Sequence, residues 1–526
     1  MPFIEKLTDE EIEARDAERL RQLGYKQELK RELSSVGNMG MALSVVCISS
    51  GLTSLFKYGL ETGGPVVMVW GWVAVSLFTL PVALAMAEIC SAYPTAGGLY
   101  FWAAQLSTPK YKAFASWMTG WYNLIGQFAV TAGIDFGLSL MLCSLINVGT
   151  DGAWTPTPGA TVGIHVLICF SHALANSFGT KVMKHINTIS TFWQVIAPLV
   201  IILTIALKAP THQSADFVFG HFNNDSGWDN MPVYVVLTGL LQAQFTLTGY
   251  DSSAHIVEES KRGEISAPVG IVSAVIISAV VGFCFIIAFL FCIQDLTATI
   301  TSQSGFPVMQ ILFDSCGRPV AIFLMVLLMV ACWFCGFASV TANSRMIYAF
   351  SRDGAIPGSA YLHKIHEKTK TPLNAVWLSA FIAALLGLPS LGNTTAFSAI
   401  TSVATISLYI SYGIPIFCKL LNDTQFKRGP LHLGKFSKII GSIAVLWIIF
   451  ITILFVLPPV SPVTATSMNY ACLAIGLVTL GAGGRFAIDA RIWFKGPITN
   501  LDPEYGEKQT IEENKTEAED GNTKNQ

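Results

Sequence analysis

Residues 240–259 read LLQAQFTLTGYDSSAHIVEE, and the character of the chain changes halfway along this stretch. A hydrophobic run that begins at Met231 gives way to polar residues and a glycine within the length of one membrane span. Hydrocarbon offers no partner to an unpaired backbone amide, so such a break is tolerated only where it faces protein or a water-filled cavity. We therefore expect a discontinuous helix whose break faces a cavity.

A second interruption lies in the first hydrophobic segment, where residues 48–54 read ISSGLTS. Broken spans at corresponding places in two halves of a chain are the best sequence pointer to the binding site of a transporter. The two breaks therefore predict a solute site at membrane depth, between the first and sixth spans.

The composition is that of a polytopic membrane protein. Of 526 residues, 52% are hydrophobic and only 13% are charged, and the net charge is −2. This balance predicts a lipid bilayer as surroundings and gives no basis for a nucleic-acid partner. The eleven cysteines lie mostly in apolar runs, which favours small buried side chains over a metal or redox site.

About 20 apolar residues cross a membrane as a helix, and this gauge predicts twelve transmembrane helices in an all-α fold. They cover residues 36–57, 65–90, 114–147, 160–178, 186–207, 231–257, 268–293, 320–348, 373–388, 395–418, 439–457 and 464–493. Spans one to five and six to ten form two halves, each opening on a broken helix, as a five-plus-five inverted repeat with discontinuous helices 1 and 6 requires.

The predicted domains follow from these spans. Residues 1–34 form an N-terminal segment, and 35–495 form the twelve-helix domain. Within it, repeat one covers 35–208, repeat two covers 231–418, and helices 11 and 12 cover 439–493. The acidic stretch 496–526 is predicted to be disordered. Lys and Arg concentrate in the even-numbered loops, which places both termini in the cytoplasm. The plasma membrane is the default location, with the vacuole or an endomembrane as alternatives.

Three residues at the first break, Ser49, Ser50 and Gly51, are predicted to bind a carboxylate. A helix that restarts at mid-membrane presents free amides, which attract an anion. The alternative is that these small residues allow close helix packing.

At the sixth-span break, Phe245 and Tyr250 are predicted to cover the solute, and Thr248 to offer its hydroxyl beside Gly249. Asp251 follows directly, and an intramembrane acid is a functional candidate by default. A structural hydrogen bond to a neighbouring helix is the alternative for Asp251.

Asp135 is the other deep acid, near the centre of the third span. It is predicted to pair with the ammonium group of the substrate, to hold a proton, or to fix a helix contact.

Three further stretches carry a family resemblance: residues 87–100 (AEICSAYPTAGGLY), residues 248–259 from TGYD to EE, and residues 343–354 (NSRMIYAFSRDG). With them the chain resembles the amino acid, polyamine and organocation transporter superfamily, and is most similar to its amino acid and choline branch, which includes GABA and choline permeases. The resemblance implies a five-plus-five fold with the substrate between spans one and six. It also implies that Ser49 to Gly51, Phe245 and Thr248 bind the substrate, and that Asp251 occupies the acidic position of the family.

One departure concerns coupling. Several proton-coupled members of the superfamily place a lysine inside span five, but residues 187–206 contain none. Proton coupling through Asp135 or Asp251, exchange and facilitated diffusion remain open. A sodium site using Ser339 and Thr341 is the less favoured expectation, and no cofactor is expected.

The function predicted from the sequence is transport of an amino acid or related small zwitterion by alternating access, with GABA favoured. Choline or another organic cation is the alternative, and a nutrient receptor that does not transport is less favoured. We find no arrangement of residues typical of an enzyme. The expected partners are a small-molecule substrate and lipid, and no oligomeric state follows from the sequence.

Overall fold

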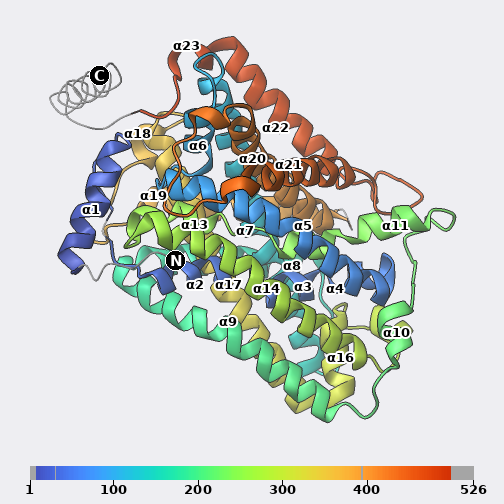
Figure 1. Ribbon diagram of the computed structural model, residues 1–526. Coiled ribbons are helices and arrows are strands. Elements are labelled where there is room, and N and C mark those ends of the chain that lie inside the picture. The colour runs from blue at the N-terminus through green and yellow to red at the C-terminus, as the bar shows by residue number, and fades with distance from the viewer. Residues whose placement is uncertain (1–7, 30, 393–394, 499–526) are drawn as a thin grey trace, which may run out of the picture.

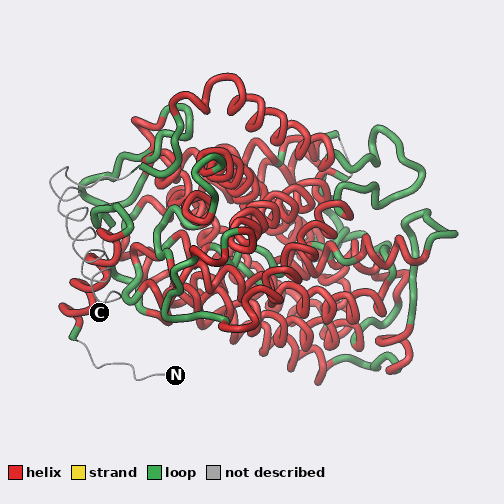
Figure 2. Tube along the Cα trace, turned by 45° about the horizontal axis from the view of Figure 1, so that its top comes forward, coloured by secondary structure: helices red, strands yellow, loops and turns green. Residues whose placement is uncertain are grey.

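The computed structural model describes residues 8–29, 31–392 and 395–498. Most of the predicted disordered tail, from residue 499 onward, and residues 1–7 of the predicted N-terminal segment lie outside this range. Within it the chain is almost entirely helical, and the tube in Figure 2 contains no strand. Two isolated β-bridges join Leu33 to Ser260 and Thr62 to Asn224.

Eleven stretches of the described chain are helical, long and apolar enough to cross a membrane. The remaining predicted crossing is the sixth along the chain. It falls short of that length because it is divided into short helices. The crossings are formed by α2 (Ser35–Val45) with α3 (Ile48–Ser54), α5 (Gly64–Ala92), α7 (Lys112–Gly149), α8 (Pro158–Ser177), α9 (Thr180–Lys208), α11 (Pro232–Gly239) with α12 (Leu241–Thr246) and α13 (Ser252–His255), α14 (Gly263–Phe291), α17 (Arg318–Arg352), α19 (Leu373–Leu386), α20 (Ala396–Leu421), α21 (Ser437–Leu454) and α22 (Ala471–Arg485).

Shorter helices lie at the ends of these crossings. They are α1 (Asp9–Gln22), α4 (Phe56–Glu61), α6 (Leu99–Leu106), α10 (Ala215–Gly220), α15 (Leu296–Ile300), α16 (Pro307–Cys316), α18 (Ser359–Leu362), α23 (Arg491–Trp493), η1 (Val257–Glu259), η2 (Leu388–Leu391), η3 (Asp423–Gln425), η4 (Gly434–Phe436) and η5 (Phe486–Ala490).

The boundaries differ most at the last span, which was predicted to begin at residue 464 but begins at Ala471. The preceding residues form a turn instead, in which the hydroxyls of Thr464 and Ser467 accept hydrogen bonds from each other's backbone amides. Such local bonds between short polar side chains and the backbone compete with a helix.

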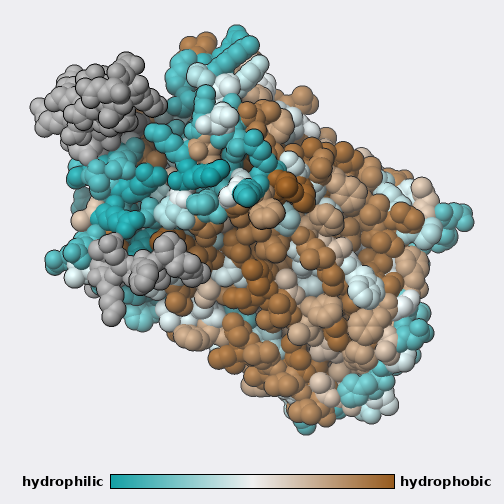
Figure 3. Space-filling model, viewed as in Figure 1, coloured by the Kyte–Doolittle hydropathy of each residue, from teal (hydrophilic) through white to brown (hydrophobic). Residues whose placement is uncertain are grey.

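A broad hydrophobic belt covers the face of the molecule seen in Figure 3, and polar residues gather beyond its edges. The lipid-facing side of α9 contributes to the hydrophobic surface, since Leu203 and Leu207 are exposed although both are aliphatic. Large exposed apolar side chains in such a band are explained by contact with lipid rather than water.

The two ends of the bundle differ in content. In Figure 1, α1, α18 and α23 lie at one end, and α10, α11 and α16 lie at the other. We call the first end the terminal face and the second the opposite face. At the centre of the bundle, α7 packs against α17, α20 and α8, and α14 packs against α5 and α2.

Candidate functional site

The first break separates α2 from α3 at Val46 and Cys47. Cys47 has an extended backbone, with φ −68° and ψ 107°, and α3 starts at the next residue. The amides of Ser50 and Gly51 donate to the Cys47 carbonyl. The hydroxyl of Ser49 is buried and has no hydrogen-bond partner among the described residues. The start of α3 therefore offers an unused hydroxyl at membrane depth.

The second break runs from Leu247 to Asp251, between α12 and α13. Gly249 has a φ of +95°, a left-handed conformation that glycine adopts without the steric cost of a side chain. The sixth crossing is thus discontinuous, as its sequence predicts.

The two breaks touch each other. A Cβ added to Gly51 would lie 2.5 Å from Thr246 Oγ1 and 2.7 Å from Thr246 Cα. A Cβ on Gly249 would lie 2.6 Å from Val45 Cγ1. Each glycine therefore allows the end of one broken span to approach the other.

A small cavity with a volume of about 10 Å³ lies at this crossing. Its lining comes from both breaks and from α7 and α17: Val45, Cys47, Ser50, Gly51, Val130, Ile134, Phe245, Thr246, Thr248 and Cys335. One ordered water needs about 10–15 Å³ on this measure. In this conformation the lining therefore closes over the space, and an amino acid fits only after side chains or helices move.

Four of the predicted substrate-binding residues line the cavity: Ser50, Gly51, Phe245 and Thr248. The hydroxyl of Thr248 already donates to the Gln244 carbonyl, at 2.6 Å. The hydroxyl of Ser50 accepts from the Cys332 thiol, at 3.2 Å. Their roles in binding stay predictions, but the fold brings them together around one space.

Tyr250 and Asp251 lie behind the cavity, toward α7 and α20. The Tyr250 ring packs on Tyr412, with centroids 5.2 Å apart. The Asp251 carboxylate is completely buried and accepts hydrogen bonds from four side chains: Asn123 (2.9 Å), Gln127 (2.9 Å), Tyr412 (2.8 Å) and His255 (3.2 Å). Donors from α7, α13 and α20 therefore already use this carboxylate. This favours a structural role for Asp251, in hydrogen bonds between helices, over binding of the substrate.

Asp135 also points away from the cavity. Its Oδ1 lies 3.1 Å from Nδ1 of His172 on α8, and its Oδ2 accepts from the Cys169 thiol, at 3.2 Å. His172 was not among the residues predicted from the sequence. The only signal in the sequence that points to His172 is its position three residues after Cys169 on one helix. That spacing does not indicate which residue of another helix His172 contacts.

The residues weighed for ion coupling have other contacts. Ser339 shares a hydrogen bond with Thr131, at 2.7 Å, and Thr341 donates to Asn176, at 2.6 Å. In α9, the Gln194 amide accepts from the Cys47 thiol and donates to the Ala331 carbonyl. This helix therefore brings a neutral amide, and no lysine, to the first break.

A larger hollow, which we call the vestibule, opens toward the opposite face and has a volume of about 730 Å³. Lys57, Glu61 and Ser54 contribute to its wall, and Phe136 stacks on Phe397 there with centroids 5.7 Å apart. The Ser54 hydroxyl donates to the Ser50 carbonyl, at 2.6 Å. The vestibule therefore ends one helical turn from the cavity.

Between the cavity and the terminal face, buried ion pairs join neighbouring helices. Arg345 Nε lies 2.7 Å from Glu259, with both side chains at 3% exposure or less. Glu258 lies 3.6 Å from Arg352 and accepts from the Ala96 amide, at 2.9 Å. We call the Arg345–Glu259 pair the latch. The backbone amide of Leu33 also donates to the Glu259 carbonyl, so the N-terminal segment covers the latch.

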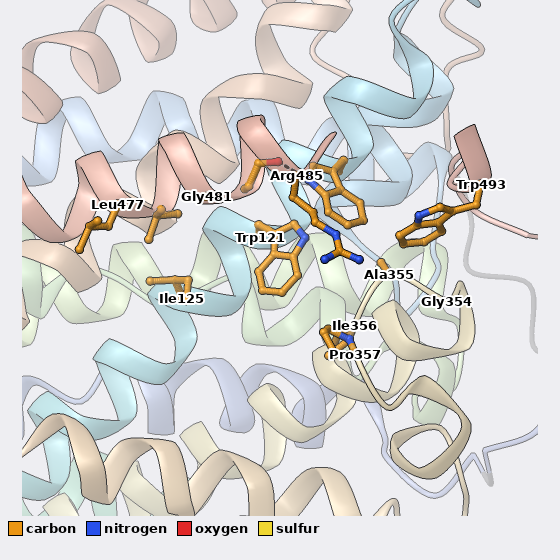
Figure 4. A pocket seen from close by; sticks show the side chains of 13 residues that line it. Trp121, Ile125, Gly354, Ala355, Ile356, Pro357, Leu477, Gly481, Arg485 and Trp493 are labelled. Carbon is orange, nitrogen blue, oxygen red and sulfur yellow. Dashed lines mark hydrogen bonds between the residues drawn. The ribbon is translucent and has the colours of Figure 1, made fainter. Parts of the chain in front are cut away.

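Another hollow, of about 640 Å³, lies between α7 and α22. Figure 4 shows Trp121 and Ile125 beside Leu477 and Gly481, with the Arg485 guanidinium between Trp121 and Trp493. Apart from Arg485 its lining is mostly apolar, and it includes neither break. It therefore does not qualify as the substrate site.

Two comparisons with known proteins, one with family models and one with curated sequences, agree on a family. The model of the amino acid permease family matches residues 34–479. The amino-acid permease BAT1 homologue of Oryza sativa subsp. japonica is 41% identical over 498 residues, which are 92% of this chain and 96% of that protein. The amino-acid permease BAT1 of Arabidopsis thaliana has the same identity and coverage. The GABA-specific permease of Saccharomyces cerevisiae is 32% identical over 503 residues, which are 94% of this chain and 87% of that protein.

Among solved structures, MhsT in complex with L-phenylalanine has a TM-score of 0.54 and 17% sequence identity, over 80% of this chain and 99% of that one. At this identity the likeness concerns the fold alone. It places the chain in the five-plus-five inverted-repeat class of polytopic helical proteins, with helices 1 and 6 discontinuous.

Proposed function

The chain belongs to the amino acid permease family and is a multi-pass membrane transporter of amino acids rather than an enzyme; from this premise we propose that it carries a small zwitterionic amino acid, GABA in first place, by alternating access. The observation that carries the proposal is the contact between the two broken spans around one cavity, with Gly51 against Thr246. The 32% identity to the GABA-specific permease gives GABA only weak support.

The substrate carboxylate binds at the start of α3, beside Ser49 and Ser50. Amides in the first turn of a helix and the positive end of its dipole favour an anion. The unpartnered Ser49 hydroxyl supports this placement. The ammonium group faces the last carbonyls of α2 and α12, where the negative ends of two helix dipoles converge.

Access alternates between the vestibule and the terminal face. The vestibule is open in this conformation, and the latch closes the other side. The lining moves apart to admit the substrate from the vestibule, and the vestibule then closes behind it. Separation of Arg345 from Glu259 then opens the terminal side. The proposed orientation has both termini in the cytoplasm, and the proposed membrane is the plasma membrane.

Choline or another organic cation is less well supported. A cation without a carboxylate needs a free acid or open aromatic faces. Asp251 is occupied by four donors and Tyr250 packs on Tyr412. Neither residue lines the cavity as the cation site requires.

Counterflow in reconstituted liposomes tests the proposal. Liposomes loaded with unlabelled GABA are expected to take up labelled GABA, and excess external amino acid competes while choline does not. Ser50→Ala is expected to weaken GABA affinity by about ten-fold, because a hydrogen bond to a charged group contributes about 1.5–3 kcal/mol. Binding without counterflow would indicate a receptor. Choline counterflow that GABA leaves unchanged would indicate the cation carrier.

A further inference from the structure

A buried polar stripe runs along α8 and meets Asp135, a deep acid that does not line the cavity. Most of the exposed side of α8 is apolar, with Leu167, Phe170 and Leu174 among its residues. The buried side instead carries four polar residues and a cysteine at helical spacing: Thr161, His165, Cys169, His172 and Asn176. Side chains three or four residues apart share one helix face. Such a row is costly inside a membrane domain and is therefore a functional candidate.

Asp135 and His172 sit at the middle of this stripe, both with no exposed surface. Their nearest atoms are 3.1 Å apart, yet neither ring nitrogen of His172 has an aligned hydrogen-bond partner among the described residues. Gly336 of α17 makes room for the pair, because a Cβ there would lie 2.4 Å from Asp135 Oδ1 and 2.3 Å from His172 Cε1.

The surroundings supply no permanent positive charge. From α7, α8 and α17 the titratable groups near the pair are the thiols of Cys169 and Cys332, and His165 beyond Cys169. The helix α19, which also packs here, contains no titratable residue. Among the described residues, His172 is the only basic group within ion-pair distance of Asp135.

We infer that Asp135 and His172 together form the binding site for one transported proton. An ionised aspartate beside a neutral histidine leaves one buried negative charge, which is expensive where no water reaches it. One proton on the pair makes it neutral overall. The pair therefore keeps its proton while the site is closed and exchanges it when water enters from either side. This inference rests on the proposed transport function.

The stripe connects the pair to both sides of the transporter. Toward the vestibule, Thr161 belongs to the vestibule wall, and His165 Nε2 lies 3.8 Å from the Cys169 thiol, which donates to Asp135. A proton taken from vestibule water thus has polar side chains along its way to the carboxylate.

Toward the terminal face, hydrogen bonds continue to the latch. Asn176 donates to the His172 carbonyl and accepts from Thr341. Ser344 donates to the Thr341 carbonyl, at 2.8 Å, and accepts from Arg345, at 3.1 Å. Arg345 pairs with Glu259, so hydrogen bonds through Asn176, Thr341 and Ser344 join the backbone of α8 at His172 to the latch. A movement of α17 that opens the latch therefore reaches the helix that carries His172.

Proteoliposomes separate this inference from the proposed function. With the membrane potential held at zero, a pH difference of one unit supports about a ten-fold GABA gradient if one proton moves with each substrate. Wild type is expected to approach that value and to acidify the liposome interior as GABA enters. Asp135→Asn and His172→Gln are expected to accumulate no GABA above equality, while counterflow without a pH difference persists.

The controls are His212→Gln and Asp216→Asn, two exposed residues between α9 and α11, which are expected to behave as wild type. If the Asp135 and His172 variants fail to fold, the inference is still tested by whether wild type acidifies the liposome interior as GABA enters. Net GABA uptake without proton movement in wild type overturns the inference and leaves amino-acid transport intact. A folded His172→Gln protein that still accumulates GABA in response to a pH difference overturns it as well. Absence of any amino-acid counterflow overturns the proposed function instead.

Discussion

Gly51 shows how one missing methyl group shapes the site. A Cβ at this position would lie 2.7 Å from the Cα of Thr246 and collide with it. Because this Cα belongs to the backbone of α12, the collision is relieved only if α12 shifts. Overpacking of this kind typically costs about 1–3 kcal/mol. We expect Gly51→Ala to lower the melting temperature and to abolish counterflow.

The matched control for this change is Gly163→Ala in α8, where a Cβ meets no atom within 4 Å. It is expected to leave transport and melting unchanged. A Gly51→Ala protein with normal counterflow would contradict the close crossing of the two broken spans.

Asp251 is a second test at the scale of a single residue. Four donors surround its carboxylate, and an asparagine would turn an NH2 group toward one of them. A buried donor left without an acceptor costs about 1–3 kcal/mol. Asp251→Asn is therefore expected to melt at a lower temperature, while the folded fraction binds GABA with unchanged affinity. Normal melting with a lost affinity would show instead that Asp251 is a substrate ligand.

Among the elements, the segment after the last crossing is tied to the end of α17. The backbone amide of Ile498 donates to Asp353 Oδ1, at 3.1 Å, and the Tyr100 hydroxyl donates to Oδ2, at 2.7 Å. Burial raises the pKa of Asp353 from 3.8 to about 6, although Arg352 and the Tyr100 hydrogen bond oppose the rise. Asp353 thus holds its proton more tightly in the folded protein than in the unfolded chain.

The sign of the pH dependence follows from this shift. Ionised Asp353 costs stability above pH 6, by about 3 kcal/mol at most, and the cost declines as the pH falls through 6 toward 3.8. Asp353→Asn is expected to melt at a higher temperature than wild type at pH 7, with a smaller difference at pH 5. A lower melting temperature at pH 7 would mean that the two hydrogen bonds outweigh the cost of burial. Asp216→Asn serves as the exposed control.

At the scale of the whole molecule, alternating access requires the vestibule to close when substrate binds. Lys57 lines the vestibule, and 46% of its side chain is exposed. We expect Lys57→Cys to react with a membrane-impermeant maleimide, and saturating GABA to slow the reaction several-fold. Wild type, with its native cysteines, measures the background.

The same variant tests the orientation. The reagent is expected to reach Lys57→Cys only from the side away from the termini, which a terminal tag marks independently. Labelling from the same side as the tag would contradict the assignment of the vestibule to the opposite face. Unchanged labelling with saturating GABA would contradict closure of the vestibule.

The sequence by itself determined the membrane class, the approximate crossings and the positions of both breaks. These features are local. A run of about 20 apolar residues is enough to predict a span, and a glycine among polar residues interrupts the helix whichever helices pack against it. The predicted third span, 114–147, lies within α7 (Lys112–Gly149), and the predicted sixth-span break coincides with the end of α12 at Thr246.

Only the tertiary structure decided which polar residues face the cavity. Asp251 and Asp135 look alike in the sequence as lone acids at membrane depth. The first is enclosed by donors from α7 and α20, and the second is paired with His172 of α8. Helix rotation and the choice of neighbours arise from packing between segments far apart in the chain, so no local pattern encodes them.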